Sequence, residues 1–139
     1  MSPNATTIYT LVSVTDANGC VKNNNNFITI TVNQLPTVTL SGTTSICVGL
    51  SSDLDFNLGG NPNFTVDYTI NGVPTSSVFT STGPNPLTVS PLVTTTYSLV
   101  SITDVFGYVN NTVFGSVTIT VNPLPTANLS GDNTICDGI

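Results

Sequence analysis

Two aspartates in the segment Asp53-Leu54-Asp55 are the first residues of this sequence whose chemistry could serve a function. Side chains at positions i and i+2 point to the same side of a β-strand, so the two carboxylates could hold a cation together. The competing interpretation is that they are the solvent-facing positions of an amphipathic strand. Calcium takes about six to eight oxygen ligands, and no third acid is near in sequence, so the second interpretation is favoured.

The segment Asp16-Ala17-Asn18-Gly19 begins like a calcium-binding loop, in which Asp and Asn alternate before a glycine. The later Asp and Glu ligands of such a loop are missing here, and the corresponding segment 104–107 lacks the asparagine. Asp, Asn and Gly are also the residues that build tight turns. We therefore predict a turn at both places, and we assign no metal-binding residue in the chain.

The amino-acid composition excludes most other kinds of catalytic and metal-binding site. His, Glu, Arg and Trp are absent, Lys22 is the only base, and 6% of the 139 residues are charged, against about a quarter in ordinary soluble domains. Without His there is neither a Ser-His-Asp nor a Cys-His nucleophile, and no ordinary zinc or haem site. One cation is too few for phosphoryl transfer or for binding a phosphate backbone. We expect no enzyme, no catalytic residue, no cofactor and no nucleic-acid partner.

The hydrophobic content predicts a chain that folds. Hydrophobic residues make up 39% of the sequence and the formal net charge is −6, whereas disordered chains combine high charge with low apolar content. No apolar run approaches the length of about 18 residues that a membrane-spanning helix needs. We therefore expect a buried core and no membrane insertion.

Alternation with a period of two indicates β-strands, and no stretch has the period of a helix. Asn71-Gly72, between two alternating runs, is a strong signal for a two-residue hairpin. Tyr97 lies where immunoglobulin-like folds place a tyrosine corner, and a plain core tyrosine is the alternative. The predicted strands lie at 38–40, 53–58, 64–70, 78–79, 87–89, 97–103 and 117–121. Short strands separated by turns predict an antiparallel β-sandwich.

The chain also repeats itself. Residues 9–19 match residues 97–107 at 7 of 11 positions with an offset of 88, and residues 28–37 match residues 117–126 with an offset of 89. The match continues from the Ile-Cys pair at 46–47 to the same pair at 135–136. Internal similarity at a fixed period is the signature of a repeat protein. One repeat therefore has about 89 residues.

The period sets the expected domain boundaries. We expect residues 1–33 to be the C-terminal part of a preceding repeat, 37–122 to be one complete repeat, and 126–139 to hold the N-terminal strand of a following one. Residues 34–36 and 123–125 are short linkers, which their prolines stiffen. Met1 then falls in the middle of a domain, so we interpret the chain as a window on a longer array.

The residues that carry this repeat resemble a known family. They are Thr-Thr-Ile-Tyr-Thr-Leu-Val-Ser-Val-Thr-Asp-Ala-Asn-Gly-Cys at 6–20, Ile-Thr-Val-Asn-Gln-Leu-Pro-Thr at 30–37 and Ser-Ile-Cys-Val-Gly at 45–49. This pattern is similar to the tandem immunoglobulin-like or PKD-like repeats of very large secreted surface proteins of Bacteroidota. The resemblance covers essentially the whole chain. It implies immunoglobulin-like sandwiches in tandem, export by a type IX route, and a role as a surface adhesin or fibre.

The resemblance also implies a cysteine pattern. In such repeats a Cys after the Asn-Gly turn and a Cys near the first strand pair within one domain. Cys20 occupies the first position, Cys47 and Cys136 occupy the second, and Tyr108 replaces the first in the complete repeat. Cys47 is then expected to be a small buried thiol, and the partners of Cys20 and Cys136 to lie outside the chain. A Cys20–Cys47 disulfide across the linker is the alternative.

Two functions fit these expectations. The first is a non-catalytic structural repeat of an extracellular or cell-surface stalk or fibre, whose partners are neighbouring repeats or like subunits. It is favoured because most Phe and Tyr residues fall on inward strand positions. The alternative is an adhesin module that binds glycans or a surface receptor, or a subunit of a self-assembling filament. The two partial repeats together hold 47 of about 89 residues, so the ends of two chains cannot complete one sandwich.

Overall fold

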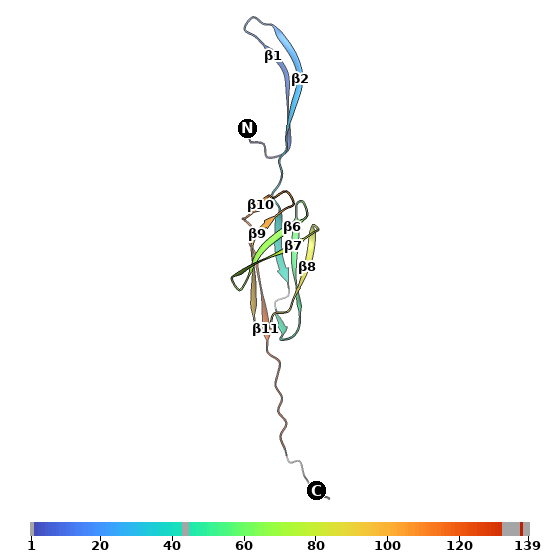
Figure 1. Cartoon of the computed structure of the whole chain (residues 1–139), viewed down its shortest axis with the longest axis vertical. Coiled ribbons are helices and arrows are strands. Elements are labelled where there is room, and N and C mark those ends of the chain that lie inside the picture. The colour runs from blue at the N-terminus through green and yellow to red at the C-terminus, as the bar shows by residue number, and fades with distance from the viewer. Residues whose placement is uncertain (1, 43–44, 132–136, 138–139) are drawn as a thin grey trace. The chain divides into compact units, whose positions relative to one another are not determined.

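The computed structural model describes residues 2–42, 45–131 and 137, and its regular structure consists of β-strands (Figure 1). No helix long and apolar enough to cross a membrane occurs in these residues. The chain divides into two compact units, Met1–Leu35 and Pro36–Ile139. The division falls within the expected linker 34–36, while the boundaries of the repeats themselves stay a prediction.

The first unit is a single hairpin. Strand β1 (Thr7–Thr15) pairs antiparallel with β2 (Val21–Ile30), and Tyr9 lies opposite Ile28. Two strands alone cannot cover either face of their sheet. Large apolar side chains on both strands are therefore exposed, namely Ile8, Leu11, Val12, Val14, Val21, Phe27 and Ile28.

The second unit is a β-sandwich, which confirms the predicted fold class. One sheet has the order β4-β11-β9-β6-β7, with β10 paired to β9, and the other has the order β3-β5-β8. Neighbouring strands are antiparallel except β11 and β4, which are parallel. The strands are β3 (Thr37–Gly42), β4 (Ser45–Cys47), β5 (Ser52–Gly59), β6 (Phe64–Ile70), β7 (Val73–Phe79), β8 (Gly83–Val89), β9 (Thr95–Thr103), β10 (Val109–Asn110) and β11 (Ser116–Asn122).

Each strand predicted within residues 37–122 is present, and two further strands in this segment were not predicted. Strand β4 has three residues and β10 has two. Runs of this length are too short for alternation of apolar and polar residues to be recognised. Their pairing comes from neighbours distant in sequence, since β4 lies beside the end of β11 and β10 beside the end of β9.

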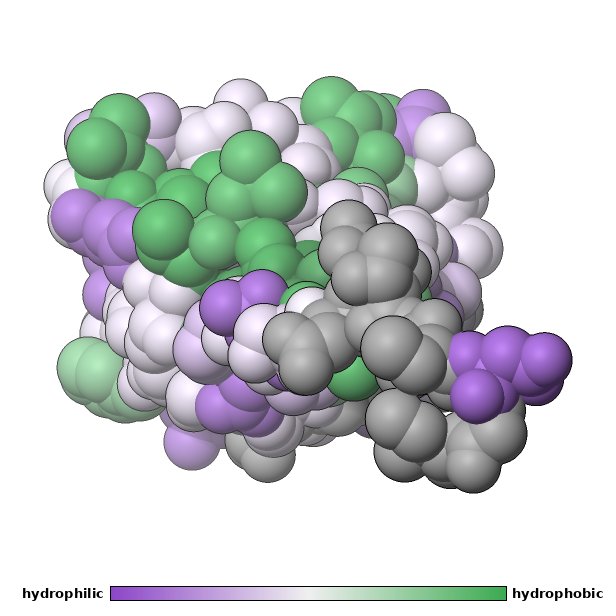
Figure 2. Space-filling model, turned by 90° about the horizontal axis from the view of Figure 1, so that it is seen from below, coloured by the Kyte–Doolittle hydropathy of each residue, from purple (hydrophilic) through white to green (hydrophobic). Residues whose placement is uncertain are grey.

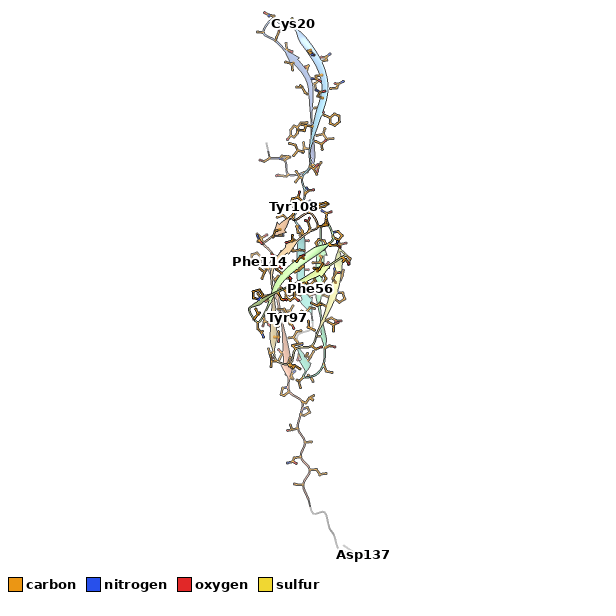
Figure 3. The ribbon with its side chains drawn as sticks, viewed as in Figure 1. Cys20, Phe56, Tyr97, Tyr108, Phe114 and Asp137 are labelled. Carbon is orange, nitrogen blue, oxygen red and sulfur yellow. The ribbon has the colours of Figure 1, made fainter. Side chains whose placement is uncertain are left out.

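The core lies between the two sheets. In β5 the buried residues alternate with outward ones, so Leu54, Phe56 and Leu58 all face inward. The Phe56 side chain is fully buried (Figure 3). Its ring centroid lies 5.4 Å from that of Tyr68 and 5.0 Å from that of Phe79. The remaining buried apolar residues are Val38, Ile46, Phe64, Val66, Tyr97, Leu99, Ile102, Val113, Val117 and Ile119. Burial of each large side chain contributes about 1.5–3 kcal/mol.

The sandwich has two ends, which we call proximal and distal. At the proximal end the chain enters at Pro36, whose carbonyl oxygen accepts a hydrogen bond of 2.8 Å from Asn110 Nδ2. At the distal end the chain leaves β11 at Asn122, which pairs with Cys47. Strand β10 pairs with the C-terminal end of β9, at the proximal end of the sandwich. Strand β11 pairs with the N-terminal half of β9 and continues beyond it to the distal end. Strand β9 therefore spans the distance between the two ends (Figure 1).

The hairpin of the first unit has the register of part of the sandwich. Tyr9 faces Ile28 in the hairpin, and Tyr97 faces Val117 between β9 and β11. The pair at the other end of the hairpin, Thr15 with Val21, corresponds in the repeat alignment to Thr103 with Val109. The repeated sequence therefore produces the same strand pairing in both units.

Candidate functional site

Asp53 and Asp55 both lie on the outer side of β5, as the amphipathic pattern predicts. Asp53 is exposed, and its Oδ1 accepts a hydrogen bond of 2.6 Å from Thr88 Oγ1 on the neighbouring strand β8. Asp55 is half-buried and lies opposite Pro86. Among the described residues, no group of three or more His, Cys, Asp or Glu side chains is placed to hold a metal ion.

Asp104 builds the turn between β9 and β10. Its Oδ1 accepts hydrogen bonds of 3.0 Å from the backbone N–H groups of both Phe106 and Tyr108. Gly107 has φ of 83°, a conformation that glycine adopts without strain. Asp104 is 6% exposed, and its Oδ2 has no hydrogen-bond partner in the described part of the chain. The turn predicted for residues 104–107 is confirmed.

Asp16 makes the same turn in the first unit. Its Oδ1 accepts hydrogen bonds of 2.9 Å from the backbone N–H groups of Asn18 and Cys20. Gly19 also has φ of 83°. The carboxylate is thus occupied by backbone donors, as in an Asx turn, and the predicted turn is confirmed here too.

Cys47 does not have the expected environment. The prediction of a small buried thiol is wrong, because Cys47 is an exposed free thiol. The reason is the alternation along β4, where Ile46 points into the core and its neighbour must point outward. Cys20 is also exposed and free, so the Cys20–Cys47 disulfide is not formed. Cys136 lies outside the described residues.

The structure also contradicts pairing of the two cysteine positions within one sandwich. Cys47 lies at the distal end, where it pairs with Asn122. Tyr108 occupies the other cysteine position and lies at the proximal end (Figure 3). The 9 residues of β9 separate these ends, which is roughly 25–30 Å at about 3.3 Å per residue. A disulfide requires Cα atoms within about 7 Å.

Tyr97 is a core residue of β9. It is 4% exposed, and within the described chain its hydroxyl forms none of the hydrogen bonds that define a tyrosine corner. The alternative, a plain core tyrosine, therefore holds. Burial raises the pKa of the Tyr97 hydroxyl, and the nearby Tyr68 adds to the rise.

A groove of mixed polarity, about 570 Å³ in volume, lies over β6 and β7, and its lining is Asp67, Tyr68, Thr69, Pro74, Thr75, Ser76 and Val100. Asp67 Oδ2 accepts a hydrogen bond of 2.9 Å from Ser101 Oγ on β9. The groove therefore presents hydroxyl groups and one carboxylate beside apolar side chains.

Two exposed phenylalanine rings lie on separate loops of the sandwich, which the sequence pattern did not predict. Phe106 is 67% exposed and Phe114 is 86% exposed, and Figure 3 shows Phe114 directed away from the core. Both lie between β9 and β11, outside the alternating segments. Because both residues lie in turn or loop sequence, their exposure could have been predicted from that position.

An apolar groove of about 370 Å³ lies at the distal end. Its lining includes Val48, Leu92, Val93, Val121 and Leu124. Figure 2 looks at this end and shows hydrophobic surface gathered across part of it. The groove joins the end of β11 to the segment between β8 and β9, which lie far apart in the sequence.

Comparison with known proteins gives no family. No protein-family model matches the chain, and no curated protein sequence matches it. One similar solved structure comes from a study described as "Structural insight into host cell surface retention of a 1.5-MDa bacterial ice-binding adhesin"; the identity is 18% and the TM-score 0.43. The match covers 80% of this chain and 40% of that one. A likeness of this degree carries no inference about what this chain does.

Proposed function

We propose that the chain is a structural repeat of an extracellular or cell-surface protein, in which tandem β-sandwiches form a non-catalytic stalk or fibre. The observation that carries the proposal is the repeated local structure. The Asp16 turn and the Asp104 turn have the same pair of backbone hydrogen bonds, and the strands that follow them have the same register. Units that repeat in this way are the parts of extended arrays.

The chemistry of the chain supports the same function. Lys22 is the only base, so trypsin-like proteases have one cleavage point in the chain. Charged residues make up 6% of the sequence, and hydroxyl groups such as that of Thr88 lie beside the few carboxylates on the sheets. The resemblance of the repeat motifs to those of large secreted Bacteroidota surface proteins, with export by a type IX route, belongs to this proposal. Neighbouring repeats and like subunits are the proposed partners.

An adhesin module is the second candidate, because exposed aromatic rings occur on loops. Phe106 and Phe114 could stack on a ligand, and the groove at Asp67 offers polar contacts. Glycans or a surface receptor would be the partner. A catalytic role is not proposed, since the sequence has no histidine and a single cationic side chain, that of Lys22.

The mass of the native polypeptide tests the array. Antibodies raised against the 139-residue chain would be used to detect the protein in its source cells, with and without protease treatment of intact cells. We expect a band of hundreds of kilodaltons that disappears when the cell surface is digested. A band near 14.4 kDa would contradict the array, and a band protected from external protease would contradict surface exposure.

A glycan-binding screen separates the stalk from the adhesin. The 139-residue chain would be compared with a variant carrying Phe106→Ala and Phe114→Ala, which removes two exposed rings and leaves the core intact. A stalk shows no binding across a broad panel of glycans. Binding by the wild-type chain that the double variant loses would favour the adhesin.

A further inference from the structure

One face of the hairpin in the first unit exposes apolar side chains whose aligned residues in the sandwich are buried. Leu11 is 47% exposed, whereas the aligned Leu99 is 9% exposed. The other aligned pairs are Val14 (56%) with Ile102 (0%) and Ile28 (64%) with Val117 (9%). We call the hairpin face with Leu11, Val14 and Ile28 the open face. Contiguous apolar surface of this kind marks an interaction site in soluble proteins.

The second unit shows which structure covers a face of this sequence. There the aligned strands are β9 and β11, and strand β3 of the opposite sheet packs against both. Leu40 of β3 packs against the buried cluster that includes Leu99 and Val117. The cover is thus a second sheet, formed by β3, β5 and β8.

The outer edge of β1 has the features with which β9 pairs to β6. In the sandwich, Ser101 Oγ on β9 donates a hydrogen bond of 2.9 Å to Asp67 Oδ2 on β6. The aligned residue of β1 is Ser13, which keeps the hydroxyl group. Both strands have an irregularity at aligned positions, since the pairing skips Val12 in β1 and Val100 in β9. Within the described residues, β1 has no strand on this edge.

The turn after β6 also contacts β9. The backbone N–H of Thr96 donates a hydrogen bond of 2.8 Å to Asn71 Oδ1, and the N–H of Asn71 donates one of 2.8 Å to the Thr96 carbonyl oxygen. Ile8 is the residue of β1 aligned with Thr96, and its backbone offers the same donor and acceptor. The outer edge of β1 therefore matches β6 at Ser13 and the turn after β6 at Ile8.

We propose that the open face and the outer edge of β1 together are the docking site for a half-sandwich with the strands of residues 37–89, which precedes the hairpin in the array. This inference rests on the proposed function. The docked strand of the β6 type directs alternate apolar side chains toward the open face, places an Asp beside Ser13 and ends in an Asn-Gly turn at Ile8. Such strand addition gains affinity from main-chain hydrogen bonds and specificity from the alternate side chains.

The test adds the half-sandwich without changing any residue of the hairpin. A second copy of residues 37–91 is joined to Asn4, because Pro91 aligns with Pro3 and the junction then keeps the repeat. The matched control is the same longer chain with Phe56→Asp in the added copy, which places a charge in the core of that copy.

Amide hydrogen exchange of Ile8 and Thr10 is measured by NMR in both longer chains and in the 139-residue chain. The N–H of Thr96 points to β6, so the N–H groups of the aligned Ile8 and, by alternation along the strand, of Thr10 point to the outer edge of β1. The amide of Thr96 in the intact sandwich is the internal reference, and its exchange should be equal in all three chains.

We expect exchange at Ile8 and Thr10 to be at least about tenfold slower in the longer chain than in the 139-residue chain, because docking pairs and covers β1. The Phe56→Asp control should return exchange to the fast rate. Equal rates in the longer chain and its control would overturn the docking site. Slow exchange in the 139-residue chain itself, at any concentration, would also overturn it, since β1 would then be covered by its own unit or by a second hairpin.

The mass of the native polypeptide separates failure of this inference from failure of the array. A surface protein of hundreds of kilodaltons together with fast exchange in the longer chain would leave the array intact and remove the docking site. A native band near 14.4 kDa together with slow exchange would remove the array and leave the hairpin as a surface that accepts a half-sandwich.

Discussion

The backbone N–H of Val121 donates a hydrogen bond of 3.1 Å to Thr94 Oγ1, which ties the last strand of the sandwich to the loop before β9. The same bond, also 3.1 Å, joins Val32 to Thr6 in the first unit. The first unit has no second sheet within the described residues. The bond therefore depends on the repeated sequence and on the pairing of two strands, and it does not require the second sheet of the sandwich.

Replacing Thr94 should weaken the sandwich by removing this bond. Thr94→Val keeps the shape of the side chain but leaves the N–H of Val121 without its acceptor, so we expect a loss of about 1 kcal/mol in the free energy of unfolding. Urea unfolding monitored by tyrosine fluorescence measures it. Thr88→Val, which removes an exposed hydroxyl from Asp53, is the control and should change stability by less than about 0.5 kcal/mol. Equal losses in the two variants would contradict the role of the Thr94 bond.

Asp104→Ala should destabilise the sandwich more than Asp16→Ala does. Asp104 is buried and accepts two backbone hydrogen bonds, so its loss leaves two donors unpaired, at about 1–3 kcal/mol. Asp16 makes the same bonds in the exposed hairpin of the other unit. Urea unfolding of the sandwich should therefore be unaffected by Asp16→Ala, and similar midpoints for both variants would refute this prediction.

Phe56→Ala should remove much of the stability of the core. Phe56 is fully buried and packs against Tyr68 and Phe79, and truncation of a buried Phe costs about 3–5 kcal/mol. Phe114→Ala is the matched control, because Phe114 is 86% exposed and surface changes usually stay within about 0.5 kcal/mol. Thermal unfolding followed by circular dichroism compares them. A Phe114 variant as unstable as the Phe56 variant would mean that the assignment of the core is wrong.

The pKa of Tyr97 predicts a loss of stability in alkali. Burial raises this pKa in the folded state above the ordinary value of 10.0, so above that pH the unfolded chain releases the proton while the folded chain retains it. The folded state then binds more protons, and the free energy of unfolding falls as the pH rises. Tyr97→Phe should be nearly neutral at pH 7 and should reduce the fall above about pH 10.

The control for this pH profile is Tyr9→Phe, which lies in the other unit. Urea midpoints of the sandwich measured from pH 7 to about pH 11 should follow the wild-type curve in that variant. A Tyr97→Phe curve that coincides with the wild-type curve would remove Tyr97 as the source of the alkaline effect.

The strands and turns of the sandwich could be predicted because their signals are local. In β5 the alternation of Leu54 and Phe56 with two aspartates gave both the strand and its buried face. The two Asp turns could be predicted for the same reason, since a carboxylate reaches the backbone N–H groups two and four residues further on. Strands β4 and β10 could not be predicted, because their pairing depends on β11 and β9 rather than on their own sequence.

The candidate surfaces were beyond sequence reasoning for a related physical reason. The groove at Leu92 exists only because the loop before β9 and the end of β11 meet at one end of the sandwich. Cys47 and Tyr108 looked like the two halves of one disulfide site, but β9 holds them at opposite ends. The order of residues along the chain does not show which end of the sandwich each of them occupies, because that depends on how the strands pair.

The sequence by itself determined that this protein is an all-β repeat with defined turns, because alternation, turn residues and the period of about 89 residues act over short stretches of chain. The tertiary structure decided which ends of the sandwich carry the exposed thiol, the apolar groove and the turn with Phe106 and Tyr108. Those placements depend on how strands distant in sequence pair and on which sheet each one joins. They are set by packing of the whole core rather than by any local pattern.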